Sequence, residues 1–308
     1  MISSARMVSP FAREAAYVAQ NRISPVTPGQ KRHEGMAMAR WILVGAGAMA
    51  GGLLIAAIIA LLVARSLFAE PGVERLSDLR SELGEAGLLF VFAHPDDEIT
   101  ANALMARGIE AGVPVHLFTA TRGEAGTQYP PVVDQPHLGV VREAEARKHG
   151  FALGVASHTV LDLGDGQLRA RPFDQLVERV AAEIARTRPS SVVTFHPESA
   201  ISLHPDHMAI GEAARQAVEA LGDNAPRLVY VLAPRPGLRR FGGERGRLIA
   251  DIQPEPDFAV PSPSRDKQRA WRIHESQSLY LQATYGLSPR VMYALWTSEY
   301  YAFADGAD

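Results

Sequence analysis

An uninterrupted apolar segment at residues 41–64 constrains this chain more than any other feature of its sequence. The segment reads WILVGAGAMAGGLLIAAIIALLVA, contains no charged residue, and lies between Arg40 and Arg65. As an α-helix it would extend about 36 Å, at about 1.5 Å per residue, and the hydrocarbon core of a bilayer is about 30 Å thick. The segment therefore predicts a single helix that spans a membrane and anchors the rest of the chain.

Two other interpretations of this segment are weaker. A helix in the core of a soluble protein rarely runs so long, and the segment shows no polar face. A cleaved signal peptide usually has an apolar run of about 7–15 residues, followed by a cleavage site of small residues. The run here is longer and no such site follows it cleanly, so we interpret the segment as an uncleaved anchor.

Basic residues flank the predicted anchor unequally. Those before it are Arg6, Arg13, Arg22, Lys31, Arg32 and Arg40, and those soon after it are Arg65, Arg75 and Arg80. Lys and Arg near the end of a membrane helix favour the cytoplasmic side. The excess on the first side predicts a cytoplasmic N-terminus and an extracytoplasmic main domain.

Composition divides the chain into four parts. Residues 1–39 are rich in Ser, Pro, Gly and Arg and show no apolar period, so we expect them to be disordered. The anchor with its flanking arginines occupies residues 40–65, and a short linker follows at 66–85. Residues 86–308 form the predicted globular domain, with a C-terminal lobe that starts at about residue 233.

The overall composition excludes several classes of function. The formal net charge is −3 and 21% of the residues are charged, which is not the basic character of a nucleic-acid-binding protein. The chain contains no cysteine, so disulfides, thiolate metal sites and cysteine nucleophiles are excluded. Any metal that this chain binds must therefore rest on His, Asp and Glu side chains.

Short apolar segments alternate with helical ones from residue 88 onward. The predicted strands are 88–93, 115–120, 158–163, 191–195 and 228–232, and the predicted helices are 99–111, 140–149, 173–186 and 206–220. A wholly apolar strand such as LLFVFA suits a parallel sheet that is buried on both faces. The alternation predicts an α/β, Rossmann-like fold, in which a mostly parallel sheet carries helices on both faces and follows the transmembrane helix.

Two clusters of His and Asp residues follow predicted strands, where α/β folds gather their ligands. The first is His94-Pro95-Asp96-Asp97-Glu98, and the second is His204-Pro205-Asp206-His207. Each cluster alone is equally compatible with a turn whose Asp caps the next helix. Both together favour a metal site, because zinc without thiolates takes imidazole and carboxylate ligands.

Three motifs in this order resemble the PIG-L/LmbE-like family of zinc-dependent N-acetylglucosaminyl de-N-acetylases. They are AHPDDE at 93–98, TRGEAG at 121–126 and HPDH at 204–207. The similarity covers about residues 87–220 and returns weakly at 267–277. It implies hydrolysis of the acetamide of an N-acetylglucosamine conjugate, which is either a small glycoside or a lipid-linked one.

The resemblance also implies a metal site. It assigns His94, Asp97 and His207 as the ligands of Zn²⁺, with another divalent metal such as Fe²⁺ as the alternative. Such a metal lowers the pKa of its bound water and polarises the amide oxygen.

Catalytic roles follow from the same resemblance. Asp96 would be the general base, a protonated His204 would polarise the scissile carbonyl, and Asp206 would orient His204. Either Asp96 or His204 would return a proton to the leaving amine.

Other residues match the family at the expected rim of the site. Arg122 and Asp165 correspond to substrate contacts, whereas a solvated loop and an Asp-Gly turn are their ordinary alternatives. Arg142 and Glu145 match an Arg-x-x-Glu helix, which we interpret as a scaffolding i,i+3 ion pair. His274, in HESQ, either reaches the site or has a capping or core role.

One departure from the family pattern precedes HPDH. This chain has HPESAISL at 196–203 where the family often has Gly and acidic residues, so His196 is an extra ligand, a substrate contact or a packed loop residue. The departure puts the identity of the substrate in doubt more than the chemistry.

Three alternative functions are an amidase of the same scaffold that cleaves a larger or thiol-conjugated amide, a carbohydrate-binding protein without catalysis, and a nucleotide-binding Rossmann protein. The last is disfavoured because AHPDDE places carboxylates where a pyrophosphate needs a glycine-rich turn.

Overall fold

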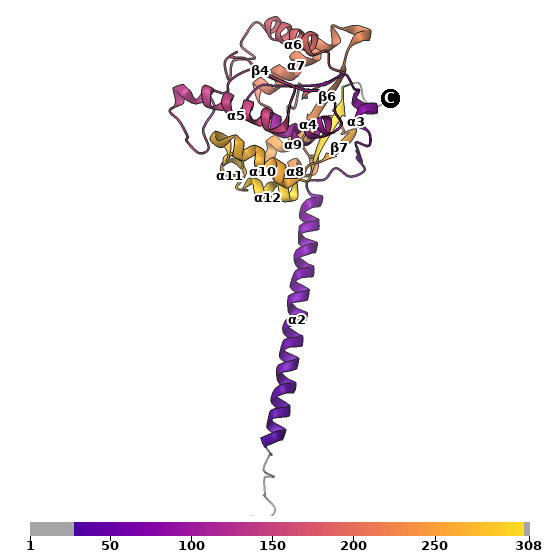
Figure 1. Ribbon diagram of the computed structural model, residues 1–308, viewed down its shortest axis with the longest axis vertical. Coiled ribbons are helices and arrows are strands. Elements are labelled where there is room, and N and C mark those ends of the chain that lie inside the picture. The colour runs from indigo at the N-terminus through magenta and orange to yellow at the C-terminus, as the bar shows by residue number, and fades with distance from the viewer. Residues whose placement is uncertain (1–27, 305–308) are drawn as a thin grey trace, which may run out of the picture. The chain divides into compact units, whose positions relative to one another are not determined.

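The computed structural model describes residues 28–304 of the chain, which divides into two compact units, Met1–Ala60 and Leu61–Asp308. The described part of the first unit belongs to helix α2, Pro28–Ser66 (Figure 1). Residues 28–39 are therefore helical, although we expected disorder over 1–39; residues 1–27 of that expectation lie outside the described residues. Pro28 stands in the first turn, where its missing N–H costs nothing, and Ala, Met, Gln and Lys favour helix.

Helix α2 contains the predicted anchor. Within its segment Met36–Ser66, an 18-residue stretch has a mean hydropathy of 2.5, and none of that stretch is buried by the rest of the chain. The helix is long and apolar enough to cross a membrane, which confirms the prediction of such a helix.

An eight-stranded sheet in the order β1-β7-β8-β6-β5-β2-β3-β4 forms the centre of the second unit. The strands are β1 (Glu74–Arg75), β2 (Leu88–Phe92), β3 (Val115–Thr119), β4 (Ser157–Val160), β5 (Ser191–Phe195), β6 (Arg227–Leu232), β7 (Phe258–Pro261) and β8 (Ser298–Phe303). Every neighbouring pair is parallel except the two that contain β8. The predicted mostly parallel sheet is confirmed.

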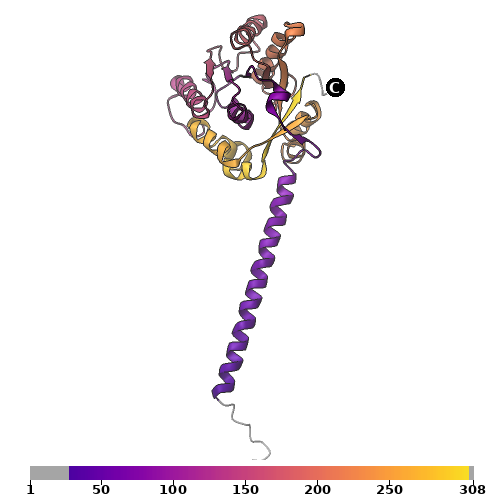
Figure 2. The same cartoon turned by 45° about the vertical axis from the view of Figure 1, so that its right-hand side comes forward.

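Helices cover this sheet on both faces. They are α3 (Leu79–Leu83), α4 (Asn102–Glu110), α5 (Leu138–Leu153), α6 (Phe173–Thr187), α7 (Pro205–Glu219), α8 (Arg235–Phe241), α9 (Gly243–Ile252), α10 (Ser264–Ile273), α11 (Tyr280–Tyr285) and α12 (Pro289–Leu295), with short 3-10 turns η1 (Asp97–Ala101), η2 (Gln135–His137), η3 (Gly222–Asn224) and η4 (Glu275–Gln277). Helices α6 and α7 pack on each other and on β2 and β5, whereas α4 and α5 contact α10, β3 and β4. Figure 2 shows the two groups apart from each other.

The order in which strands are added to the sheet reverses between β2 and β5, although these two strands are parallel. The order runs from β2 outward to β3 and β4, then returns to β5 on the other side of β2. Right-handed crossovers place α4 and α5 on one face and α6 and α7 on the other. In such sheets ligands bind at this reversal, beyond the carboxyl ends of the strands.

Close packing at the reversal depends on two features of the sequence. All five residues of β2, LLFVF, are fully buried, as expected for a central parallel strand. Helix α7 lies so near β5 that a Cβ on Gly211 would overlap the carbonyl oxygen of Phe195. Glycine at this position therefore permits the close approach of α7 to β5.

The segments at either end of the domain differ from the expected linker and lobe. Within 66–85, β1 pairs with β7, and Leu79 and Leu83 of α3 are buried. Strand β8 returns from the C-terminal region to pair with β6 and β7, so that region completes the sheet. Strands β1, β7 and β8 were not predicted from the sequence because their pairings join segments that are distant along the chain.

Candidate active site

The two His/Asp clusters meet at the reversal of the sheet. His94 follows β2, and His204 and His207 flank the start of α7, which follows β5. Between β2 and η1, Asp96 adopts the left-handed conformation with φ 94°. This turn brings the Asp97 carboxylate back, where its Oδ2 accepts the N–H groups of Ala93 at 3.1 Å and His94 at 2.8 Å.

The three side chains predicted to bind metal converge. His94 Nδ1 lies 3.1 Å from His207 Nε2, and Asp97 Oδ1 lies 3.0 Å from the same nitrogen. His94 Nδ1 is 3.6 Å from Asp97 Oδ2. In a tetrahedral zinc site with bonds of about 2.0–2.2 Å, ligand atoms are about 3.3–3.6 Å apart. Asp97 presents Oδ1 to His207 and Oδ2 to His94, and the three side chains are spaced close to three ligands of one metal ion.

Hydrogen bonds to one nitrogen of His94 and of His207 orient each ring so that its other nitrogen faces the place a metal would occupy. His94 Nε2 lies 2.9 Å from Asp165 Oδ1 and 3.3 Å from Asp206 Oδ2, and since carboxylates only accept, Nε2 carries the proton. His207 Nδ1 is 2.9 Å from the Ser202 hydroxyl. Carboxylate and hydroxyl partners of this kind fix the orientation of metal-binding histidines, so the donor set fits a divalent metal.

The charges of this cluster support each other. Burial raises the pKa of Asp97, but His207 and His94 outweigh it and hold that pKa well below its ordinary value. Burial lowers the pKa of His94, yet its contacts with Asp165, Asp206 and Asp97 raise it well above the ordinary value. Three carboxylates, those of Asp97, Asp165 and Asp206, therefore surround the His94 ring, and their negative charge favours a bound cation.

Asp96, the predicted base, lies beside this cluster and contacts Arg142. Its Oδ2 is 3.2 Å from Arg142 Nη2, which also donates to the Pro95 carbonyl at 2.6 Å. Burial raises the pKa of Asp96 to about 6, although Arg142 lowers it. A carboxylate with a pKa near 6 is matched to proton transfer at neutral pH.

His204 is held differently from the expectation. Its Nδ1 accepts the backbone N–H of Asp206 at 3.2 Å, so the neutral ring carries its proton on Nε2. Burial, then His207 and His94, lowers the pKa of His204, which favours that neutral ring over the protonated one expected. A ring nitrogen of His204 lies within 4.8 Å of ring nitrogens of His94 and His207.

The carboxylate of Asp206 does not orient His204 as we expected. It accepts the N–H of Gly166 at 2.7 Å and of Leu168 at 3.1 Å, and it lies against His94. Asp206 is fully buried at the first turn of α7, so its charge is satisfied by the loop that follows β4. Its side chain supports His94, and its backbone supports His204.

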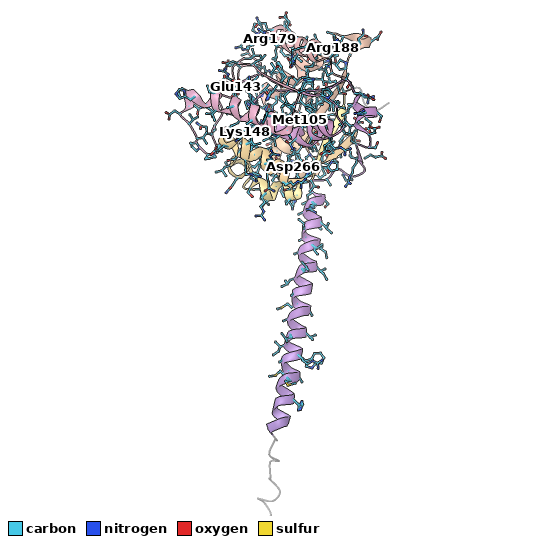
Figure 3. The ribbon with its side chains drawn as sticks, viewed as in Figure 1. Met105, Glu143, Lys148, Arg179, Arg188 and Asp266 are labelled. Carbon is cyan, nitrogen blue, oxygen red and sulfur yellow. The ribbon has the colours of Figure 1, made fainter. Side chains whose placement is uncertain are left out.

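The two expected substrate contacts both have protein partners. Asp165 binds His94 and accepts the Ala125 N–H at 3.0 Å. Arg122 pairs with Glu143 at 2.8 Å and Asp162 at 3.3 Å. Figure 3 locates Glu143 on α5, with Lys148 farther along the same helix. The roles of Asp165 and Arg122 toward substrate remain predictions.

The structure contradicts the ion pair expected between Arg142 and Glu145, and it decides between the alternatives for His196. Arg142 and Glu145 do not pair with each other: Arg142 contacts Asp96, and Glu145 accepts the N–H and hydroxyl of Ser276 at 2.8 and 2.6 Å. The Arg-x-x-Glu spacing signalled both residues but not their partners. His196 bonds the Ser199 hydroxyl at 3.1 Å and packs on Tyr230, so it is a packed loop residue.

The comparisons with known proteins identify the family to which this chain belongs. Residues 89–218 match the PIG-L family, described as GlcNAc-PI de-N-acetylase. A 1D-myo-inositol 2-acetamido-2-deoxy-alpha-D-glucopyranoside deacetylase of Kineococcus radiotolerans is 36% identical over 60% of this chain and 54% of its own. The enzyme of the same name from Geodermatophilus obscurus is 30% identical over 71% of this chain and 92% of its own.

Solved structures share the fold. The N,N'-diacetylchitobiose deacetylase of Pyrococcus horikoshii aligns with a TM-score of 0.56 at 18% identity, over 73% of this chain and 86% of that one. At 18% identity this similarity supports the fold alone.

Proposed function

Because the chain belongs to the PIG-L/LmbE-like family of deacetylases, we propose that it is a metal-dependent hydrolase that removes the acetyl group from an N-acetylglucosamine conjugate. The observation that carries the proposal is the convergence of His94, Asp97 and His207 within 3.0–3.6 Å, beside the buried carboxylate of Asp96. Three protein ligands leave a coordination position free, which is the pattern of catalytic zinc sites.

His94 Nδ1, Asp97 Oδ1 and His207 Nε2 would hold the metal. When bound, zinc or another divalent metal such as Fe²⁺ supplies a Lewis acid for the amide oxygen and lowers the pKa of a water toward about 7. Asp165, Asp206 and Ser202 keep the two imidazoles in the orientation that this requires.

Asp96 acts as the general base in this proposal. Its carboxylate takes a proton from the attacking water, and its contact with Arg142 fixes the oxygen that is not used for this transfer. The protonated Asp96 then holds a proton that the departing amine can receive when the carbon–nitrogen bond breaks. The products are acetate and a free amino sugar.

His204 stabilises the oxygen that becomes negative during the attack. The backbone N–H of Asp206 occupies Nδ1, so Nε2–H is available as a donor toward the site. A positioned donor of this kind contributes about 10²–10³ to the rate.

The substrate is proposed from the relatives. The two inositol glycoside deacetylases named above act, by their names, on an N-acetylglucosaminyl inositol, and the family is described by a glycolipid, GlcNAc-PI. A small glycoside and a lipid-linked one share the same acetamide. Helix α2 supports a membrane-anchored location, and the basic residues before it support an extracytoplasmic deacetylase domain. In this proposal the domain includes the segment 66–85, since β1 pairs with β7.

Amine release tests this function. Purified full-length protein in detergent is incubated with N-acetylglucosaminyl inositol and with N-acetylglucosaminyl phosphatidylinositol, and acetate and free amine are measured. We expect equimolar release that a chelator abolishes and added zinc restores. Binding of both compounds without release by the metal-loaded protein would instead indicate a carbohydrate-binding protein.

A further inference from the structure

A second group of ionisable side chains lies behind the candidate site and is more deeply buried than the first. Glu98, His149 and His274 are exposed by 1%, 2% and 0%, and they come from η1, α5 and the end of α10. A charge so far from water is costly unless its partners are charged and hydrogen-bonded. The role of this group must therefore be found in its contacts.

His149 and His274 both lie within hydrogen-bonding distance of the Glu98 carboxylate. His149 Nδ1 lies 2.9 Å and His274 Nε2 lies 2.8 Å from the same oxygen, Glu98 Oε1. The other nitrogen of His149 is 2.9 Å from Asn102 Oδ1. Both distances to Glu98 are ordinary N–H···O lengths, so two imidazole N–H groups share one oxygen.

The second oxygen of Glu98 reaches the catalytic turn. Glu98 Oε2 accepts the backbone N–H of Asp96 at 2.9 Å. Asp96 is the residue with φ 94°, in the left-handed region that residues other than glycine seldom adopt. The bond from Glu98 stabilises this turn, which directs the Asp96 side chain toward Arg142 and the metal ligands.

We propose that Glu98, His149 and His274 form a brace that positions the catalytic base. The two histidines hold the Glu98 carboxylate, and Glu98 holds the backbone of Asp96 in its left-handed turn. None of the three touches the reacting atoms, so they are positioning residues. This inference rests on the proposed function of Asp96.

His274 connects the brace to a second active-site loop. In the residues after it, Ser276 accepts the N–H of Tyr129 at 2.6 Å through its carbonyl, and the side chain of Gln277 donates to the Thr127 carbonyl at 3.0 Å. Tyr129 and Thr127 belong to the loop that follows β3. The segment 274–277 therefore fixes two loops at the site, although it lies more than 170 residues from Glu98 in sequence.

Paired substitutions at His274 test the brace. His274→Gln places an amide N–H near the position of Nε2, whereas His274→Leu removes the donor. We expect kcat to fall by about 10–100-fold in His274→Leu, the scale for a displaced catalytic group, with KM and zinc content near wild type. His274→Gln should recover most of that loss. Equal kcat in wild type and His274→Leu would overturn the proposal.

A double-mutant cycle separates positioning from general damage to the fold. A brace that acts through Asp96 has no effect once Asp96 is gone, so adding His274→Leu to Asp96→Asn should lower the residual rate by less than about twofold. A full further loss in the double variant would show that the brace does not act through the base. Should His274→Leu not fold, Glu98→Gln, which keeps the side-chain shape, takes its place in the same cycle.

Two controls complete the experiment. Glu183→Gln alters another buried carboxylate, which bonds Thr159 and Arg186 instead of Asp96, and should lower stability while kcat stays unchanged. Metal analysis gives one zinc per chain if the group is a brace; a second equivalent, lost in His149→Gln, would overturn it in favour of a metal site. Wild-type protein that releases no acetate would remove the proposed function itself, whereas active wild type with unaffected brace variants removes this inference alone.

Discussion

Replacement of Arg142 by leucine is expected to weaken both the fold and the base. The Arg142 side chain is 6% exposed, and its guanidinium contacts Asp96 Oδ2 and donates to the carbonyls of Pro95 and Gly123. Removing one partner of a buried ion pair costs about 3–5 kcal/mol. Each abandoned carbonyl adds about 1–3 kcal/mol where water cannot replace the donor. Because these effects overlap, we expect a loss of about 4 kcal/mol in the free energy of unfolding.

The same substitution should move the pH profile in a defined direction. Arg142 lowers the pKa of Asp96, so its removal raises that pKa above the value of about 6. The base works only when ionised, and the acidic limb of kcat/KM therefore shifts to higher pH. Arg142→Lys, which keeps the charge, should shift it less.

These effects are measured by chemical denaturation and by acetate release between pH 5 and pH 9. Arg147→Leu is the matched control, since Arg147 pairs with Glu143 at 2.8 Å on the same helix but is exposed. It should change stability by less than about 0.5 kcal/mol and leave the limb in place. An acidic limb that stays fixed or moves to lower pH in Arg142→Leu would refute the role given to this ion pair.

Three further expectations follow from the structure. Gly211→Ala should lower the free energy of unfolding by about 1–3 kcal/mol in denaturation experiments, because its Cβ overlaps the Phe195 carbonyl; unchanged stability would contradict this packing. Asp165→Asn should weaken zinc binding by about 10–100-fold in a metal titration, since Asp165 supports His94; a raised KM at normal zinc affinity would return it to the predicted substrate role. A reporter that fluoresces only in the cytoplasm should stay dark when fused after Asp308, and bright cells would reverse the proposed topology.

The centre of the sheet was predictable from sequence because its strands are short and mostly apolar. The segments at 88–93, 191–195 and 228–232 differ from β2, β5 and β6 by at most one residue at an end. Strand β8 was not predictable, since its SEYYAF pattern becomes a strand only through pairing with β6 and β7. Local pattern thus identified the parallel strands β2 to β6, whereas β1, β7 and β8 depend on pairing between segments that are distant in sequence.

The site was predictable to the same extent. Adjacent motif residues such as His94 and Asp97 were recognisable because they lie together in the chain and converge in space. The partners of Arg142 and His274 were not, because each contact joins segments far apart in sequence. The prediction for Asp206 failed for a different reason. The backbone N–H of Asp206 contacts His204, whereas the carboxylate of Asp206 turns toward His94.

The zinc content and acetate-release rate of Asp96→Asn and Asp97→Ala, measured side by side, test the central claim most directly. The claim gives these adjacent residues different tasks, with Asp97 Oδ1 facing His207 and Asp96 bound to Arg142. We predict that Asp97→Ala loses zinc together with activity. Asp96→Asn should keep zinc near the wild-type level while its rate falls by about 10²–10⁴, the usual contribution of a general base. Loss of zinc from Asp96→Asn with retention in Asp97→Ala would reverse the two roles, and normal zinc and normal rates in both would contradict the metal-hydrolase account.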